Sequence, residues 1–230
     1  MSADHAPRTP AWPPKSAPRL FVPGPLAQGQ AVSLDGPQAH YLLKVMRVQP
    51  DDAVVLCDDM TGEWAARAST VGKRDLSLTP ETLLRPREPV PDFMLCAALL
   101  KKTHFDLVLE KACELGVRTV QPVITRRCVA DKLNLERART ILIEAAEQCA
   151  RTALPALAEP VKLEALLRNW QADRTLFFAD ENAIGSGTDA AAASFTAHPG
   201  PAALLIGPEG GFDDADRALV RALPPARPIS

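Results

Sequence analysis

The stretch ALLIGPEGGFD, residues 203–213, decides how the second half of the chain is interpreted. It opens with four apolar residues, the pattern of a buried strand, and continues with a loop that contains three glycines, one proline and one carboxylate. Asp213 or Asp214 can then serve as the N-cap of a helix that we expect to reach Leu223. A strand, a tight loop and a helix in this order are typical of parallel α/β domains.

The loop at residues 207–211 is a candidate ligand site. Glycines let the backbone approach a ligand closely, and main-chain groups can bind the polar edges of a nucleoside. The carboxyl end of a parallel strand is also where α/β proteins bind ligands. The loop lacks the Lys-Ser/Thr pair of a phosphate-binding loop, which argues against a nucleoside triphosphate. Taken alone, the motif is explained at least as well by a tight turn without a ligand.

Upstream of this loop, strand and helix patterns alternate. We expect strands at residues 93–99, 119–124, 175–179 and 202–206, and helices at residues 103–115, 135–151 and 162–170. Gly116 would cap the first helix, and residues 182–200 form a small-residue loop with room for a short helix. The alternation predicts a parallel sheet covered by helices.

The first part of the chain has a different pattern. Short strand-like runs occur at residues 19–22, 30–34, 53–57, 63–69 and 75–79, with one helical piece at residues 37–47. This spacing predicts a small β-barrel over residues 19–84. The Pro-rich residues 1–18 are expected to form a disordered arm, and residues 85–91, with three prolines, a linker. Residues 92–230 would then form the α/β domain.

Composition sets limits on the possible functions. The formal net charge is −2, but residues 91–151 carry ten basic and eight acidic side chains, so a local patch can still bind phosphates. No stretch is long and apolar enough to span a membrane, and the N-terminus has no apolar signal core. The five cysteines show no metal-ligand spacing, so we expect reduced thiols in a cytoplasmic protein and no metal.

Several polar groups could contact a nucleic acid. They are Lys101 and Lys102 at a strand-to-helix junction, Arg126 and Arg127 after the next strand, Gln148 and Arg151 on one helix face, and His40, Lys44 and Arg47 on the helical piece. An amide and a guanidinium on one face can hold a base edge and a phosphate. A solvated helix start, a polar stripe or a plain basic face explains each group without a ligand.

Together these segments resemble the RsmE family of bacterial small-subunit rRNA uridine-N3 methyltransferases, in the SPOUT superfamily. The matching segments occur in order: HYLLKVMRV (40–48) followed by Pro50-Asp51, residues 101–117 ending in KACELGV, Pro122 with RRCV (126–129), EAAEQCARTALP (144–155) and LIGPEGGF (205–212). The resemblance covers about residues 19–223, and five motifs in order make it specific.

The resemblance implies a PUA-like β-barrel that helps hold RNA, followed by an α/β domain with a trefoil knot, a rare exception to unknotted folding. It also implies a homodimer, with S-adenosylmethionine bent into the knot as the cofactor. The implied partner is the small ribosomal subunit, and the implied target is a uridine in the decoding region of its 16S rRNA. The reaction would transfer a methyl group to N3 of that uridine without a metal.

The family's site residues can be carried over by motif. The cofactor would contact Phe178, Ala179, Ile206, Gly207, Pro208, Glu209, Gly210 and Gly211. The RNA would contact His40, Lys44, Arg47, Lys101, Lys102, Arg127, Gln148 and Arg151. Arg151 and Glu209 are the candidate catalytic residues, because a cation can stabilise the uridinate and a carboxylate can take the N3 proton. Glu209 is equally open to a role in fixing the loop by accepting N–H bonds.

One departure from the family pattern concerns the C-terminus. The family continues with a Leu-Gly-x-Arg-Ile-Leu-Arg-x-Glu-Thr-Ala segment that supplies part of the cofactor pocket, the threading end of the knot and much of the dimer contact. The sequence stops at Ser230, before that segment, so we expect this form to bind cofactor poorly. Two alternatives stay open: a SPOUT methyltransferase with another RNA target, and a non-catalytic RNA-binding or ribosome-assembly protein with a SPOUT-like fold.

Overall fold

The computed structural model describes residues 12–180 and 188–229 of the chain, which divides into two compact units, Met1–Glu88 and Pro89–Ser230. The boundary falls inside the segment 85–91, where the sequence predicts a linker. Residues 1–11 of the predicted arm and residues 182–187 of the predicted small-residue loop lie outside the described residues.

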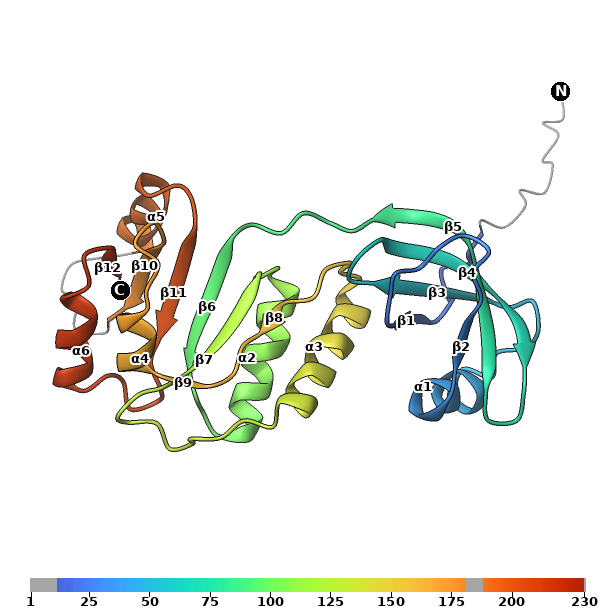
Figure 1. Ribbon diagram of the computed structural model, residues 1–230, viewed down its shortest axis with the longest axis horizontal. Helices are drawn as coiled ribbons and strands as arrows, with labels where there is room; N and C mark the ends of the chain where they lie inside the picture. The colour runs from blue at the N-terminus through green and yellow to red at the C-terminus, as the bar shows by residue number, and fades with distance from the viewer. Residues whose placement is uncertain (1–11, 181–187, 230) are drawn as a thin grey trace, which may run out of the picture. The chain divides into compact units, whose positions relative to one another are not determined.

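The first unit is built on a five-stranded sheet with the order β1-β3-β4-β5-β2 (Figure 1). Its elements are β1 (Arg19–Phe21), β2 (Val32–Leu34), α1 (Gly36–His40), η1 (Tyr41–Val45), β3 (Ala53–Asp58), β4 (Gly62–Val71) and β5 (Leu76–Pro86). Strand β1 is parallel to β3, and the other neighbours are antiparallel. The core of this unit includes Leu42, Val54, Leu56 and Leu78, all fully buried.

Three local features of this unit differ from the sequence-based expectation. Strand β5 extends to Pro86, which is paired with Gly62, so the first two residues of the predicted linker belong to the sheet. The predicted helix at 37–47 is one α-helical turn followed by a π-helix, in which the Met46 N–H donates to the Tyr41 carbonyl. The Trp12 ring covers the Arg67 guanidinium at 4.2 Å, a cation–π contact that ties residues near the arm's end to β4.

Asp58 is a fully buried carboxylate that organises the turn after β3. Its oxygens accept hydrogen bonds from the N–H groups of Leu26 (2.5 Å), Met60 (2.9 Å), Thr61 and Gly62 (3.1 Å). Burial alone would raise the pKa of Asp58, but the hydrogen bonds outweigh it and hold the pKa below its usual range. The carboxylate therefore joins the loop at residue 26 to the β3–β4 turn.

We predict that Asp58→Ala lowers the free energy of unfolding by roughly 2–4 kcal/mol, because several buried N–H groups lose their acceptor. Since the folded pKa is depressed, this stabilisation is present above about pH 3.9 and is lost as the pH falls through the folded pKa. Urea unfolding followed by the fluorescence of Trp64, whose indole donates to Thr61, would measure it. Asp59→Ala, which breaks a partly exposed ion pair with Arg87, is the control and should cost less than about 1 kcal/mol. Equal losses in the two variants would contradict the assignment.

The second unit contains a seven-stranded parallel sheet with the order β12-β10-β11-β6-β7-β8, and β9 also pairs with β7. Its strands are β6 (Phe93–Ala98), β7 (Thr119–Ile124), β8 (Ala156–Leu157), β9 (Val161–Lys162), β10 (Thr175–Ala179), β11 (Ala202–Ile206) and β12 (Ala226–Ile229). Its helices are α2 (Lys102–Glu114), α3 (Leu135–Cys149), α4 (Leu163–Arg168), α5 (Thr188–Ala197) and α6 (Asp214–Arg221). The four strands predicted here are confirmed, while β8, β9 and β12 were missed.

Helices cover both faces of this sheet. On β10, Leu176 and Phe178 point into a core shared with α4 and α6, whereas Phe177 points to the other face and meets Phe195 of α5, with ring centroids 4.2 Å apart. Figure 1 shows α2 and α3 side by side next to β6 and β7. Helix α6 begins after Asp213, whose carboxylate accepts from the Asp216 N–H, as the sequence predicts. The predicted combination of a β-rich first unit and a parallel α/β second unit is confirmed.

Candidate functional site

The loop at residues 207–211 is shaped by its glycines. A turn closes where the Gly211 N–H donates to the Pro208 carbonyl at 2.8 Å, and Gly211 has a left-handed φ of 66°. Residue 207 has to be a glycine for a steric reason, because a Cβ there would lie 2.7 Å from the Phe212 ring. Phe212 is fully buried and packs edge-on against Phe178 at 4.8 Å. The loop is thus held against the sheet by a contact that only glycine permits.

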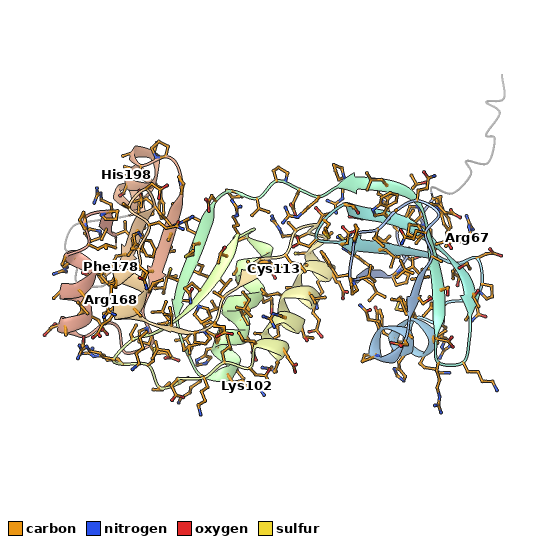
Figure 2. All side chains as sticks on the ribbon, in the orientation of Figure 1. Arg67, Lys102, Cys113, Arg168, Phe178 and His198 are labelled. Atoms are coloured by element: carbon orange, nitrogen blue, oxygen red, sulfur yellow. The ribbon has the colours of Figure 1, made fainter. Side chains whose placement is uncertain are left out.

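This loop borders a cavity of about 660 Å³ at the carboxyl end of β10 and β11. The cavity is lined by Ala179, Asp180, Ile206, Gly207, Pro208, Glu209, Gly210, Gly211 and Ile229. All the residues predicted to contact a cofactor line it except Phe178, which is labelled in Figure 2 and whose side chain is fully buried. The structure therefore gathers the predicted set around one space, and the identity of its ligand stays a prediction.

Sequence reasoning missed two cavity residues, Asp180 and Ile229. Asp180 directly follows β10, so the rule that ligands bind at carboxyl strand ends could have included it. Ile229 belongs to β12, whose strand pattern is hidden by Pro228 within it and by Pro224 and Pro225 just before it; this strand is at the sheet edge, where proline is tolerated.

Asp180 anchors helix α6 to the cavity. Its carboxylate is fully buried and forms ion pairs with Arg217, at 3.3 Å, and with Arg221. Its N–H donates to the Ile229 carbonyl at 2.9 Å. A buried carboxylate is tolerated only with such partners, so Asp180, α6 and β12 form one connected wall of the cavity.

Glu209 connects the loop to the start of α2. Its Oε1 lies 3.0 Å from Nδ1 of His104, which belongs to the first turn of α2. This hydrogen bond is the main cause that lowers the pKa of Glu209, and the nearby charge of Lys101 adds to it. The Glu209 carboxylate is therefore ionised at neutral pH. The structure brings Lys101 and Glu209 together, although they are far apart in the sequence.

The turn after β7 adds two arginines. Arg127 donates from Nη1 to the Gly210 carbonyl at 2.8 Å, which places its guanidinium beside the loop. Arg126 donates its backbone N–H to the Asp216 carboxylate at 3.0 Å, and its side chain pairs with Glu164. Desolvation raises the pKa of the buried Asp216. Segments that follow β6, β7, β10 and β11 thus meet at one edge of the sheet.

Arg151 and Gln148 lie elsewhere in the unit. The Arg151 guanidinium packs on Gly116 and donates to the Glu114 carbonyl at 3.4 Å, at the C-terminal end of α2. Lys101 and His104 stand at the opposite end of this 13-residue helix, roughly 20 Å away. Within one chain, Gln148 and Arg151 therefore lie far from Lys101 and Lys102, and the prediction that all four contact RNA stays a prediction. The spacing of these residues in the sequence could not reveal on which side of the sheet each helix ends.

In the first unit, His40, Lys44 and Arg47 are all exposed. Tyr41 and Val45 are exposed beside them, so this face combines cations with apolar side chains. Such a face can bind RNA, as the sequence suggested, or remain solvated.

Among residues 12–180 and 188–229, no three His, Cys, Asp or Glu side chains are grouped as metal ligands. No helix in this described part of the chain is long and apolar enough to cross a membrane.

Comparison with known proteins gives consistent matches. Residues 86–230 match the family described as an RNA methyltransferase domain, and residues 34–81 match an RNA methyltransferase PUA domain. The ribosomal RNA small subunit methyltransferase E of Rickettsia conorii is 25% identical over 213 residues, covering 92% of this chain and 86% of its own. The protein of the same name from Synechocystis is 31% identical over 194 residues, covering 83% of this chain and 63% of its own. A Legionella pneumophila structure, described as a methyltransferase with the cofactor SAM bound, has a TM-score of 0.81 and 26% identity, covering 93% and 88% of the two chains.

We predict that Gly207→Ala lowers the free energy of unfolding by roughly 1–3 kcal/mol, because the added methyl group meets the buried Phe212 ring. Gly210→Ala is the matched control, since its Cβ would have only an ordinary contact, 3.8 Å from Arg127. Its effect should stay within about 0.5 kcal/mol. Urea unfolding of both variants measures the difference, and equal stability would show that the Phe212 contact does not restrict residue 207.

Proposed function

The chain belongs to the RNA methyltransferase family and, within it, to the RsmE group; from this premise we propose that it methylates N3 of a uridine in 16S rRNA. S-adenosylmethionine is the methyl donor and the small ribosomal subunit is the source of the substrate. The observation that carries the proposal is the cavity of about 660 Å³ beside the GPEGG loop. We extend the proposal to a homodimer acting in the cytoplasm, as the resemblance to the family implies.

The cavity suits the proposed cofactor in size and lining. Its volume lies within the range of roughly 300–1,000 Å³ typical of small-molecule sites. Ile206, Pro208 and Ile229 supply apolar surface, while the main chain at residues 207–211 offers N–H and C=O groups to a polar ligand. When bound, S-adenosylmethionine supplies a methyl group that its sulfonium already activates for transfer. The chain therefore has to position the two reactants and exclude water.

The cations beside the loop provide the RNA side of the proposal. Uridine N3 carries a proton and is hidden in base pairs, so the base must be exposed before it can react. Loss of that proton leaves a negative charge, which a nearby cation stabilises. Arg127 is held beside the loop by its bond to Gly210, and Lys101 and Lys102 stand at the start of α2. We assign the stabilising role to Arg127 and Lys101, and to Lys102 a contact with the RNA backbone.

Glu209 fits a positioning role better than that of the base. A general base works best when its pKa is near the working pH, and the pKa of Glu209 is lowered. Its hydrogen bond to His104 fixes the 207–211 loop to α2. Arg151 and Gln148, at the other end of α2, are proposed as RNA contacts away from the cavity, as are His40, Lys44 and Arg47 of the PUA-like unit.

The proposal is tested by methyl transfer to small-subunit rRNA. The protein is incubated with labelled S-adenosylmethionine and small subunits from cells that lack the activity, and the rRNA is digested to nucleosides for mass spectrometry. We expect 3-methyluridine as the labelled product. Label in another nucleoside would indicate another RNA target, and RNA binding without label would indicate a non-catalytic RNA-binding protein.

Two substitutions separate the possible roles of Glu209. Glu209→Gln keeps an acceptor for His104, so we expect it to retain most of the methyl-transfer rate and cofactor affinity. Glu209→Ala removes the bond to α2 and should weaken S-adenosylmethionine binding roughly tenfold. Calorimetry and single-turnover rates would measure both. A Glu209→Gln variant that binds cofactor normally but has lost methyl transfer would instead identify Glu209 as the base.

A further inference from the structure

A second cavity, of about 330 Å³, lies beside the first turn of α2. Lys102 and Asp106 of α2 line it together with Arg137 of α3. Figure 2 labels Lys102 at the start of α2. The same turn carries His104, which contacts Glu209 of the cofactor loop. The first turn of α2 therefore contributes to both sites at the carboxyl edge of the sheet.

The lining of this second cavity combines an apolar floor with a basic rim. Leu99, Phe105 and Ala138 are 1–2% exposed and belong to its lining. The rim carries Lys102 and Lys132, both exposed, and in the part of the chain that the structure describes neither forms a salt bridge. An apolar floor accepts the face of a base, and rim cations accept phosphates.

One wall of this cavity is held in place by a bidentate ion pair between α2 and α3. Arg137 donates from Nη1 and Nη2 to the two carboxylate oxygens of Asp106, at 2.8 and 2.7 Å. Asn134 caps α3 by accepting from the Arg137 N–H at 3.0 Å, which fixes the backbone at the same point. A planar guanidinium held in this way offers a flat surface on which a base can stack.

We propose that this cavity holds the base of a nucleotide that flanks the target uridine in the RNA strand. The inference rests on the proposed function. Exposing the target breaks the stacking of its neighbours, whose faces then need a new partner. The first cavity lies at the ends of β10 and β11, and the second lies beside α2, which follows β6. Because β6 lies between β11 and β7 in the sheet, the two sites are a few strand spacings apart, a distance on the order of 10 Å. A short stretch of single-stranded RNA can span that distance.

Two substitutions test the proposal through RNA binding. Ala130, a partly exposed residue of the lining, lies in the loop before α3, and Ala130→Trp would fill the cavity without changing any charge. Lys132→Ala removes one rim cation. Arg168→Ala is the control, because Arg168 is an exposed cation beside Thr175 and Pro225, at the amino end of β10. Affinity for a fluorescent fragment of small-subunit rRNA is measured by anisotropy at several salt concentrations, with cofactor affinity measured in parallel.

We expect Ala130→Trp to weaken RNA binding roughly tenfold with an unchanged salt dependence, because it removes a base contact. Lys132→Ala should reduce the slope of log K against log salt by about 0.7, the value for one phosphate contact on single-stranded RNA. Arg168→Ala should match the wild type, and the thermal midpoints and cofactor affinity of all variants should be unchanged.

Normal RNA binding by Ala130→Trp would overturn the inference while leaving the proposed function intact. So would an altered sedimentation of Ala130→Trp with unaltered RNA affinity, since the cavity would then face a second copy of the chain. A wild-type protein that binds neither RNA nor cofactor would instead overturn the proposed function, and this inference with it.

Discussion

The candidate site depends on the contact between the Phe212 ring and Gly207. Phe212 is anchored in the core of the second unit by Phe178, and its ring lies where a side chain at residue 207 would begin. The 207–211 loop therefore lies flat against the end of β11 and leaves the cavity beside it open. Because protein interiors are packed to the density of crystals, a ring in this position cannot move aside to admit another methyl group.

Buried charges tie the other parts of the sheet edge to this contact. Asp180 joins the end of β10 to α6 through Arg217 and Arg221, and Asp216 of α6 accepts the Arg126 N–H from the turn after β7. Removing one member of a buried pair usually costs more than the pair contributes, since a charge is left without a partner. Helix α6 thus contacts the segments that follow both β7 and β10, although these two strands are far apart in the sequence.

The sequence predicted the second unit well and its site in part. Strand and helix periodicity located the parallel sheet, and the glycines of residues 207–211 located the cavity, because both are local patterns. It could not predict that His104 contacts Glu209 or that Arg151 lies on Gly116, since these contacts depend on how far each helix runs across the sheet. Strand β12 was missed because its prolines argue against a strand, although a strand at the sheet edge tolerates them.

Net charge is a poor guide to what this chain binds. The whole sequence carries −2, yet the carboxyl edge of its parallel sheet gathers basic side chains. Arg126 and Arg137 are paired with carboxylates and mainly hold the structure together. Arg127 binds a main-chain carbonyl, and Lys102 forms no salt bridge in the part of the chain that the structure describes, whereas Lys101 lies near the Glu209 carboxylate. A polyanion close to this edge experiences these unneutralised charges, because interactions beyond about 10 Å are screened by salt. The charge that an approaching polyanion meets is therefore set by this local arrangement, in which the carboxylates of Glu209, Asp180 and Asp216 lie among the cations, and the net charge of the whole chain does not describe it.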